Sequence, residues 1–117
     1  MKPYKRTIPI YEGKLIVILS NDFGVSLSEL GEQFENANEY GGFCFRGKGF
    51  REYVIILPPD AEPCIIAHEC LHATNYCLSD SGVGVTLEND EAQAHLLGWF
   101  VGEVYEAIKK IHKTLDR

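Results

Sequence analysis

The sequence predicts an α+β domain in which a small, mostly antiparallel sheet is backed by helices. Two short apolar runs, 14–20 and 50–57, are typical of buried strands. Two longer segments, 61–78 and 88–113, have the periodicity and length of helices. The 117 residues contain no repeat, low-complexity tract or linker, so we expect residues 1–117 to form one domain with the element order β-α-β-β-α-α.

The first fifth of the chain is expected to contribute a single strand. Residues 1–13 are predicted to be irregular or weakly extended, because Pro3 and Pro9 are incompatible with a central strand. Residues 14–20, with the sequence KLIVILS, form the predicted strand. The turn residues that follow it, Asn21-Asp22-Phe23-Gly24, indicate that the chain reverses there.

A helix and a hairpin are predicted next. The sequence from Ser26 to Glu29 resembles a capping box, which predicts a helix over 27–38. Residues 40–46 and 50–57 are predicted strands, and the Gly-Lys-Gly sequence between them favours a hairpin turn.

Two helices are expected to complete the domain. Pro58-Pro59 ends the last strand, and Asp60 is the predicted N-cap of a helix over 61–78. Residues 79–85 are a predicted loop. The last helix, over 88–113, has acidic residues at its start and lysines at its end, as the helix dipole favours.

Composition limits the classes of partner. The chain has 11 basic and 17 acidic residues, a formal charge of −6, so nucleic acid and anionic membrane surfaces are not expected partners. The longest aliphatic run, 15–19, is too short for a membrane span or a signal peptide, and we expect a cytoplasmic protein. Three of the four cysteines, Cys64, Cys70 and Cys77, lie too far apart on one predicted helix to bridge one another. Reduced, packed thiols are therefore expected.

The most informative motif is His68-Glu69-Cys70-Leu71-His72, which has the form H-E-x-x-H. Residues four apart share one face of a helix, so His68 and His72 can direct imidazole nitrogens at one ion. Glu69 lies about 100° around the helix from His68 and about 60° from His72, beside the ion but not aimed at it. Two imidazoles and an adjacent carboxylate base are what zinc-dependent hydrolysis requires, together with a third ligand.

The candidates for that third ligand lie at the start of the last helix: Glu88, Asp90, Glu91 and His95. Glu91 and His95 share a helical face that continues through Gly98 and Gly102. Because glycines allow a close approach, we expect this face to pack on the helix carrying the two histidines. The spacing favours Glu91 or His95 over Glu88.

The motif, eighteen intervening residues and then Glu91 within Asn89-Asp90-Glu91 resemble the gluzincin pattern H-E-x-x-H…N-E of thermolysin-like and aminopeptidase-like zinc peptidases. Residues 66–101 are also similar to small stand-alone zincins of phages and prophages and, more loosely, to ImmA-type proteases that cleave phage repressors; the whole resemblance covers roughly residues 53–105. The chain differs from the gluzincin pattern by Asp90, which separates the Asn from the Glu. The chain does not resemble the metzincins, which have a Gly three residues and a His six residues after the second His of the motif. Asn75 and Leu78 occupy these positions here.

The resemblance implies one Zn²⁺ per chain, held by His68, His72 and Glu91, with Glu69 as general base. For His95, the resemblance and the spacing favour a role in orienting a ligand over direct ligation. Tyr76 and Tyr105 are candidates to hydrogen-bond an oxyanion, although a packing role is the alternative for each. Cys64, four residues before His68, is a weaker ligand candidate, and a buried thiol is the more ordinary interpretation.

The predicted function is zinc-dependent hydrolysis of peptide bonds in a peptide or protein substrate, bound as an added strand along a sheet edge within 40–57. The alternative is a zincin-fold regulatory or binding protein with a structural zinc and no peptidase activity. The intact Glu69 favours the enzyme, since a structural site has no use for the base. Substrate specificity and oligomeric state are not determined by the sequence.

Overall fold

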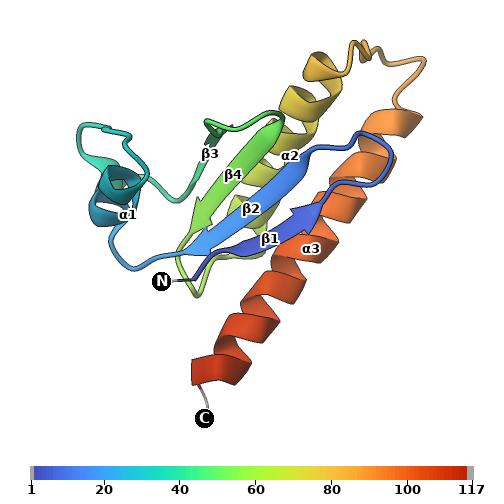
Figure 1. The fold of residues 1–117 in the computed structure, drawn as a ribbon. Coiled ribbons are helices and arrows are strands. Elements are labelled where there is room, and N and C mark those ends of the chain that lie inside the picture. Colours follow the sequence, from blue (N-terminus) through green and yellow to red (C-terminus); the bar gives the residue numbers. More distant parts are fainter. Residues whose placement is uncertain (1, 116–117) are drawn as a thin grey trace.

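The computed structural model describes residues 2–115, with side chains through residue 113, and it confirms the α+β class (Figure 1). A four-stranded sheet lies between one short helix and a pair of longer helices. The elements, in chain order, are β1 (Tyr4–Thr7), β2 (Lys14–Leu19), α1 (Phe23–Glu29), the 3₁₀ turn η1 (Ala37–Glu39), β3 (Phe43–Arg46), β4 (Glu52–Leu57), α2 (Pro63–Asp80) and α3 (Glu91–Leu115).

The strands are ordered β1-β2-β4-β3. The β1–β2 and β3–β4 pairs are antiparallel and the central β2–β4 pair is parallel, so the sheet is mostly antiparallel as predicted. The sequence suggested only a weakly extended N-terminus, whereas the structure forms a strand there. Pro3 and Pro9 flank β1 without interrupting it, and β1 lies at an end of the sheet, where proline is tolerated.

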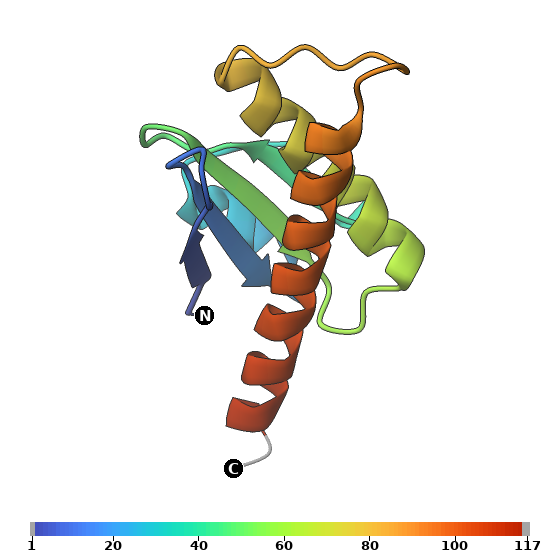
Figure 2. The ribbon, with the colours of Figure 1, turned by 90° about the vertical axis from the view of Figure 1, so that its right-hand side faces the viewer.

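Both faces of the central strands are buried, which explains their continuous apolar sequences. Alternate residues of β2 and β4 point to opposite faces. One set packs under α2 and α3 and consists of Leu15, Val17, Tyr53, Ile55 and Leu57. The other set packs under α1 and includes Ile18, Val54 and Ile56. Figure 2 shows the resulting layers, with α3 running along the sheet and extending beyond it.

The helix predicted over 27–38 is wrong in position. The observed helix begins four residues earlier, because the Asp22 carboxylate accepts a hydrogen bond from the Val25 amide (3.2 Å) and caps α1. Ser26, the predicted cap, lies inside the helix, and its hydroxyl donates to Ser20 Oγ (2.6 Å). The helix ends at Glu29, and the φ of +78° at Gly31, just beyond it, allows the paired hydrogen bonds of a Schellman motif.

The other boundaries are close to those predicted, with local shifts. Helix α2 begins at Pro63 with Glu62 as its N-cap, two residues after the predicted Asp60, and Glu62 makes no side-chain capping hydrogen bond. Helix α3 begins at Glu91 and not at residue 88. No helix in residues 2–115 is long and apolar enough to cross a membrane.

The four cysteines are free thiols, as expected. Cys70 and Cys77 lie on the buried face of α2, and burial raises the pKa of Cys70 to about 12 and that of Cys77 to about 11. Both thiols therefore stay protonated at neutral pH and pack as small apolar groups. Cys64 differs from the expectation of a buried thiol because its side chain is exposed in the first turn of α2.

The last residue of α2 ties that helix to the β3–β4 hairpin. The Arg46 guanidinium donates two hydrogen bonds from Nε and one from Nη2 to the Asp80 carboxylate, at 2.9 to 3.2 Å. The Tyr53 hydroxyl donates to the same carboxylate at 2.8 Å. Hydrogen bonds from Arg46, and secondarily from Tyr53, lower the pKa of Asp80 below its ordinary value.

We expect Asp80→Asn to destabilise the fold at neutral pH by about 1 kcal/mol, because Arg46 is half-exposed and the ion pair is partly screened. Because the pKa of Asp80 is lower in the folded than in the unfolded protein, the carboxylate stabilises the fold at pH values above its unfolded-state pKa of about 3.9. That contribution is lost as the pH falls through the pKa of the folded state. Thermal unfolding at neutral pH and at about pH 2 measures both effects. Asp60→Asn, at an exposed turn position, is the control, and an Asp80→Asn deficit independent of pH would contradict the assignment.

Candidate metal centre

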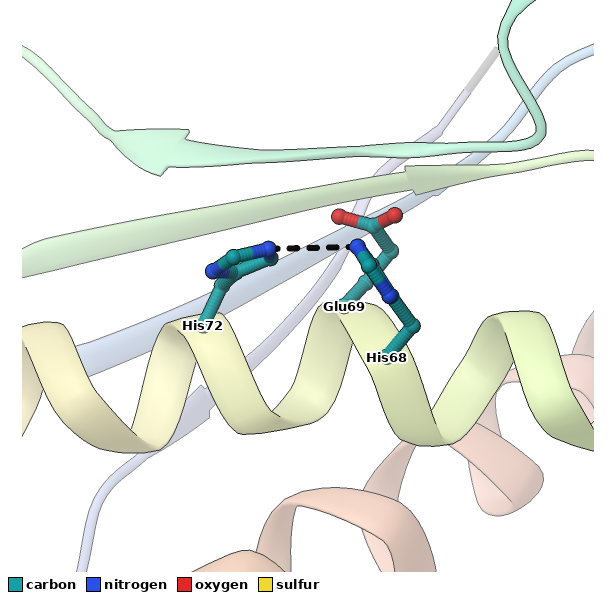
Figure 3. A group of neighbouring side chains, drawn as sticks. All are labelled: His68, Glu69 and His72. Atoms are coloured by element: carbon teal, nitrogen blue, oxygen red, sulfur yellow. Dashed lines mark hydrogen bonds between the residues drawn. The ribbon is translucent and has the colours of Figure 1, made fainter.

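His68, Glu69 and His72 form the group of potential metal ligands found within the described part of the chain. Their donor atoms lie within 4.8 Å of one another. Figure 3 shows the three side chains rising from the same side of α2, beneath strands β3 and β4. Both histidines are exposed, while Glu69 is buried.

The two imidazoles already have the separation of a pair of zinc ligands. His68 Nε2 and His72 Nε2 are 3.2 Å apart. Two ligand nitrogens at about 2.0–2.1 Å from a tetrahedral Zn²⁺ are about 3.3 Å apart, so the observed separation is compatible with both nitrogens binding one ion. Without an ion, the same separation allows a hydrogen bond between one protonated and one unprotonated nitrogen. The two histidines and their spacing therefore fit two of the ligand positions of a metal ion such as zinc.

Glu69 occupies the boundary between the cleft and the packed interior. Its side chain is 7% exposed, and burial raises its pKa, while the neighbouring His68 and His72 act in the opposite direction. No buried oxygen lacking a hydrogen-bond partner is found among the described residues, so the carboxylate keeps contact with the cleft. A carboxyl group with a raised pKa beside two imidazoles has the properties of a general base.

Gly42, just before β3, makes room for Glu69. A Cβ at this position would lie 3.3 Å from Glu69 Cγ, 3.1 Å from the Ile56 carbonyl oxygen and 3.0 Å from Leu57 Cδ2. A Cβ added at the neighbouring Gly41 would likewise lie 3.0 Å from Ile65 Cδ1 of α2. The Gly-Gly pair therefore allows the chain to pass directly over the helix that carries the motif.

A cleft of about 390 Å³ lies over this group, between α2 and the segment that enters β3. It is lined by Phe34, Tyr40, Gly41, Gly42, Phe43, Cys44, Ile65, His68, Glu69, His72 and Tyr76. Phe34, Tyr40 and the two glycines were not predicted from the sequence to line this cleft. The glycine pair was the available signal, because adjacent glycines before a strand indicate a close backbone approach.

Tyr76 is the one predicted oxyanion candidate that lines the cleft. Its ring stacks on that of His72, with centroids 6.4 Å apart, and the Arg46 guanidinium lies 4.5 Å from its centroid. Tyr105 is 38% exposed on α3 and does not line the cleft. The proximity of Tyr76 to His72 is compatible with either a packing or a hydrogen-bonding role.

The structure does not bring Glu91 or His95 to the histidine pair. Both side chains are 84% exposed, and Glu91 Oε2 pairs with His95 Nε2 at 3.4 Å along α3. His95 also lines a separate apolar pocket with Tyr11 and Trp99. Neither residue belongs to the group formed by the motif, so the structure supplies no third ligand from α3 in this conformation.

The packing argument that favoured Glu91 is wrong. A Cβ added at Gly98 or Gly102 would meet nothing within 4 Å, so this face of α3 points to solvent and not to α2. The buried face instead carries Leu96, Phe100 and Val104. Gly98 follows Leu96 by two residues, about 200° around the helix, so burial of the apolar stripe exposes the glycine face.

Comparisons with known proteins place no constraint on the site: no protein-family model, no curated protein and no solved structure matches this chain.

We expect Gly42→Ala to destabilise the protein by about 1–3 kcal/mol, because the added methyl group meets a backbone oxygen and the Glu69 side chain. Gly84→Ala is the matched control, since a Cβ there meets nothing within 4 Å. It should be neutral or slightly stabilising. Chemical denaturation of both variants measures the difference, and equal stabilities would contradict the close approach of the two chain segments.

Proposed function

We propose that the protein is a zinc-dependent peptidase in which His68 and His72 hold the metal and Glu69 is the general base. The observation that carries the proposal is the 3.2 Å separation of the two Nε2 atoms, directly beside a buried carboxylate that opens into a cleft. A pair of surface histidines on a solvated helix would have no reason to share this cleft with a desolvated glutamate.

The metal and Glu69 have separate roles in the proposed hydrolysis. A bound Zn²⁺ would supply Lewis acidity, polarising the scissile carbonyl and acidifying a water molecule. Glu69 accepts a proton from the attacking water and then donates it to the leaving amine. Its raised pKa suits both steps, because the proton must be held long enough to be transferred and then released.

Strand β3 provides a means of positioning a substrate. It ends the sheet on the side of the cleft, and Gly42 and Cys44 of this segment line the cleft together with the motif. The Gly47 amide donates to the Glu52 carbonyl, so the alternating pattern of antiparallel pairing directs the backbone groups of Cys44 and Arg46 outward. An extended peptide can add to this edge by main-chain hydrogen bonds.

The third ligand is proposed to come from the start of α3, with Glu91 favoured and His95 as the alternative. Gln93 Nε2 donates to Asn75 Oδ1 at 2.8 Å, so the first turn of α3 lies against α2 one turn beyond His72. Ligation would require Glu91 to leave His95 and the first turn of α3 to reorient. That turn follows a loop of exposed residues and has few buried contacts to lose.

We expect the wild-type chain to bind one Zn²⁺, measured by metal analysis and by competition with a chromophoric chelator. Loss of a residue that hydrogen-bonds to a metal ligand typically weakens metal binding by roughly 10–100-fold. His68→Ala and His72→Ala remove a ligand itself, so each should weaken zinc binding by more than that. Comparison of Glu91→Ala with His95→Ala identifies the third ligand as the residue whose loss has the larger effect. A wild-type chain that binds no zinc after supplementation would refute the proposal.

We expect Glu69→Gln to retain zinc and to lose hydrolysis of a broad peptide library by about 10²–10⁴-fold, because the amide cannot accept the proton. Glu29→Gln, at an exposed position of α1, is the control and should keep full activity. Zinc binding without hydrolysis in the wild type would instead favour the alternative of a structural zinc in a regulatory or binding protein.

A further inference from the structure

We propose that an aromatic cluster formed by Phe34, Tyr40 and Phe43 binds a bulky apolar side chain of an extended peptide substrate. This inference rests on the proposed function, since it assigns the substrate class of that site. The cluster is defined by its ring contacts: the centroids of Phe34 and Tyr40 lie 5.2 Å and 5.3 Å from that of Phe43.

The cluster consists of one buried ring, that of Phe43, and two exposed rings, those of Phe34 and Tyr40. Phe43 is 9% exposed and belongs to the core beneath α1. Phe34 and Tyr40 are 47% and 57% exposed, although both are large aromatic residues in an irregular segment. Exposed aromatic rings that contact one another at a cleft form the kind of surface that desolvates an apolar side chain.

The position of the cluster relative to the motif follows from the alternation of β3. Phe43 points to the α1 face of the sheet, whereas Cys44 packs with the α2 and α3 face that carries Glu69. All three aromatic residues nevertheless line the same cleft as His68, Glu69 and His72. The cleft therefore passes around the open edge of β3, from the motif on one face to the aromatic cluster on the other.

A peptide added to this edge would present its side chains to the two faces alternately. When one residue faces Glu69, the next residue along the peptide faces the aromatic cluster. The cluster carries no carboxylate, ammonium, guanidinium or imidazole group, so it favours a Phe or Leu side chain over a small or charged one. The substrate class is thus an extended peptide with a large apolar residue beside the residue that faces the motif.

The test uses capped, alanine-rich peptides that differ at one position, which is Phe, Leu, Ala or Asp. Zinc-loaded Glu69→Gln protein is titrated with each uncleaved peptide, and the wild type is assayed for cleavage of the same set. We expect a preference of about tenfold for Phe and Leu over Ala, a modest value because the cleft is open to solvent. Phe34→Ala and Tyr40→Ala should each reduce this preference in both measurements while zinc affinity stays unchanged.

Phe50→Ala is the matched control, because Phe50 is an 83% exposed aromatic residue that does not line the cleft. Two separate variants are used so that a folding defect in one, detected by circular dichroism, leaves the other to decide. Equal affinity for all four peptides, or an equal loss of preference in Phe50→Ala, would overturn the inference. If the wild type cleaves all four peptides equally well, the aromatic subsite is refuted and the proposed peptidase function is not. If the protein binds the Phe and Leu peptides more tightly but neither binds zinc nor cleaves them, the peptidase function is refuted and the subsite is retained.

Discussion

The packing of α2 on the β3–β4 hairpin is the constraint on which the candidate site depends. Ile66, Cys70, Ala73 and Cys77 form a stripe along α2 that is no more than 1% exposed. Three of these four side chains are small, so the helix can lie close to the sheet, and rotation of α2 would expose the stripe and leave cavities behind it. The orientation of His68 and His72 toward the edge of β3 is therefore fixed by the core and not by the histidines themselves.

Glu69 lies where that core meets the cleft, and its burial has a cost. Holding a carboxylate in a desolvated position disfavours its charged form, and no hydrogen bond from the described residues compensates it. A fold selected for stability alone would place an apolar residue at a position that is 7% exposed. The presence of a glutamate there, against Gly42 and beside two imidazoles, is a local conflict of the kind found at functional sites.

Most elements could be predicted from the sequence because their signals are local and strong. The apolar runs of β2 and β4 and the lengths of α2 and α3 fall within this class. Helix α1 was misplaced because the sequence favoured Asp22 as a turn residue and Ser26 as the cap. In the structure the Asp22 carboxylate caps the helix, while the Ser26 hydroxyl donates to Ser20. Strand β1 was unexpected as a strand because its four residues gain their stability from pairing with β2.

The same distinction separates the two halves of the candidate metal site. The sequence by itself determined that His68, Glu69 and His72 converge, because residues four apart on any helix share a face whatever surrounds them. The position of Glu91 was decided by tertiary structure, since the rotation of α3 is set by the burial of Leu96 and the residues in line with it. Spacing along one helix fixes the relative direction of its side chains, but only packing between helices fixes which direction faces a neighbour.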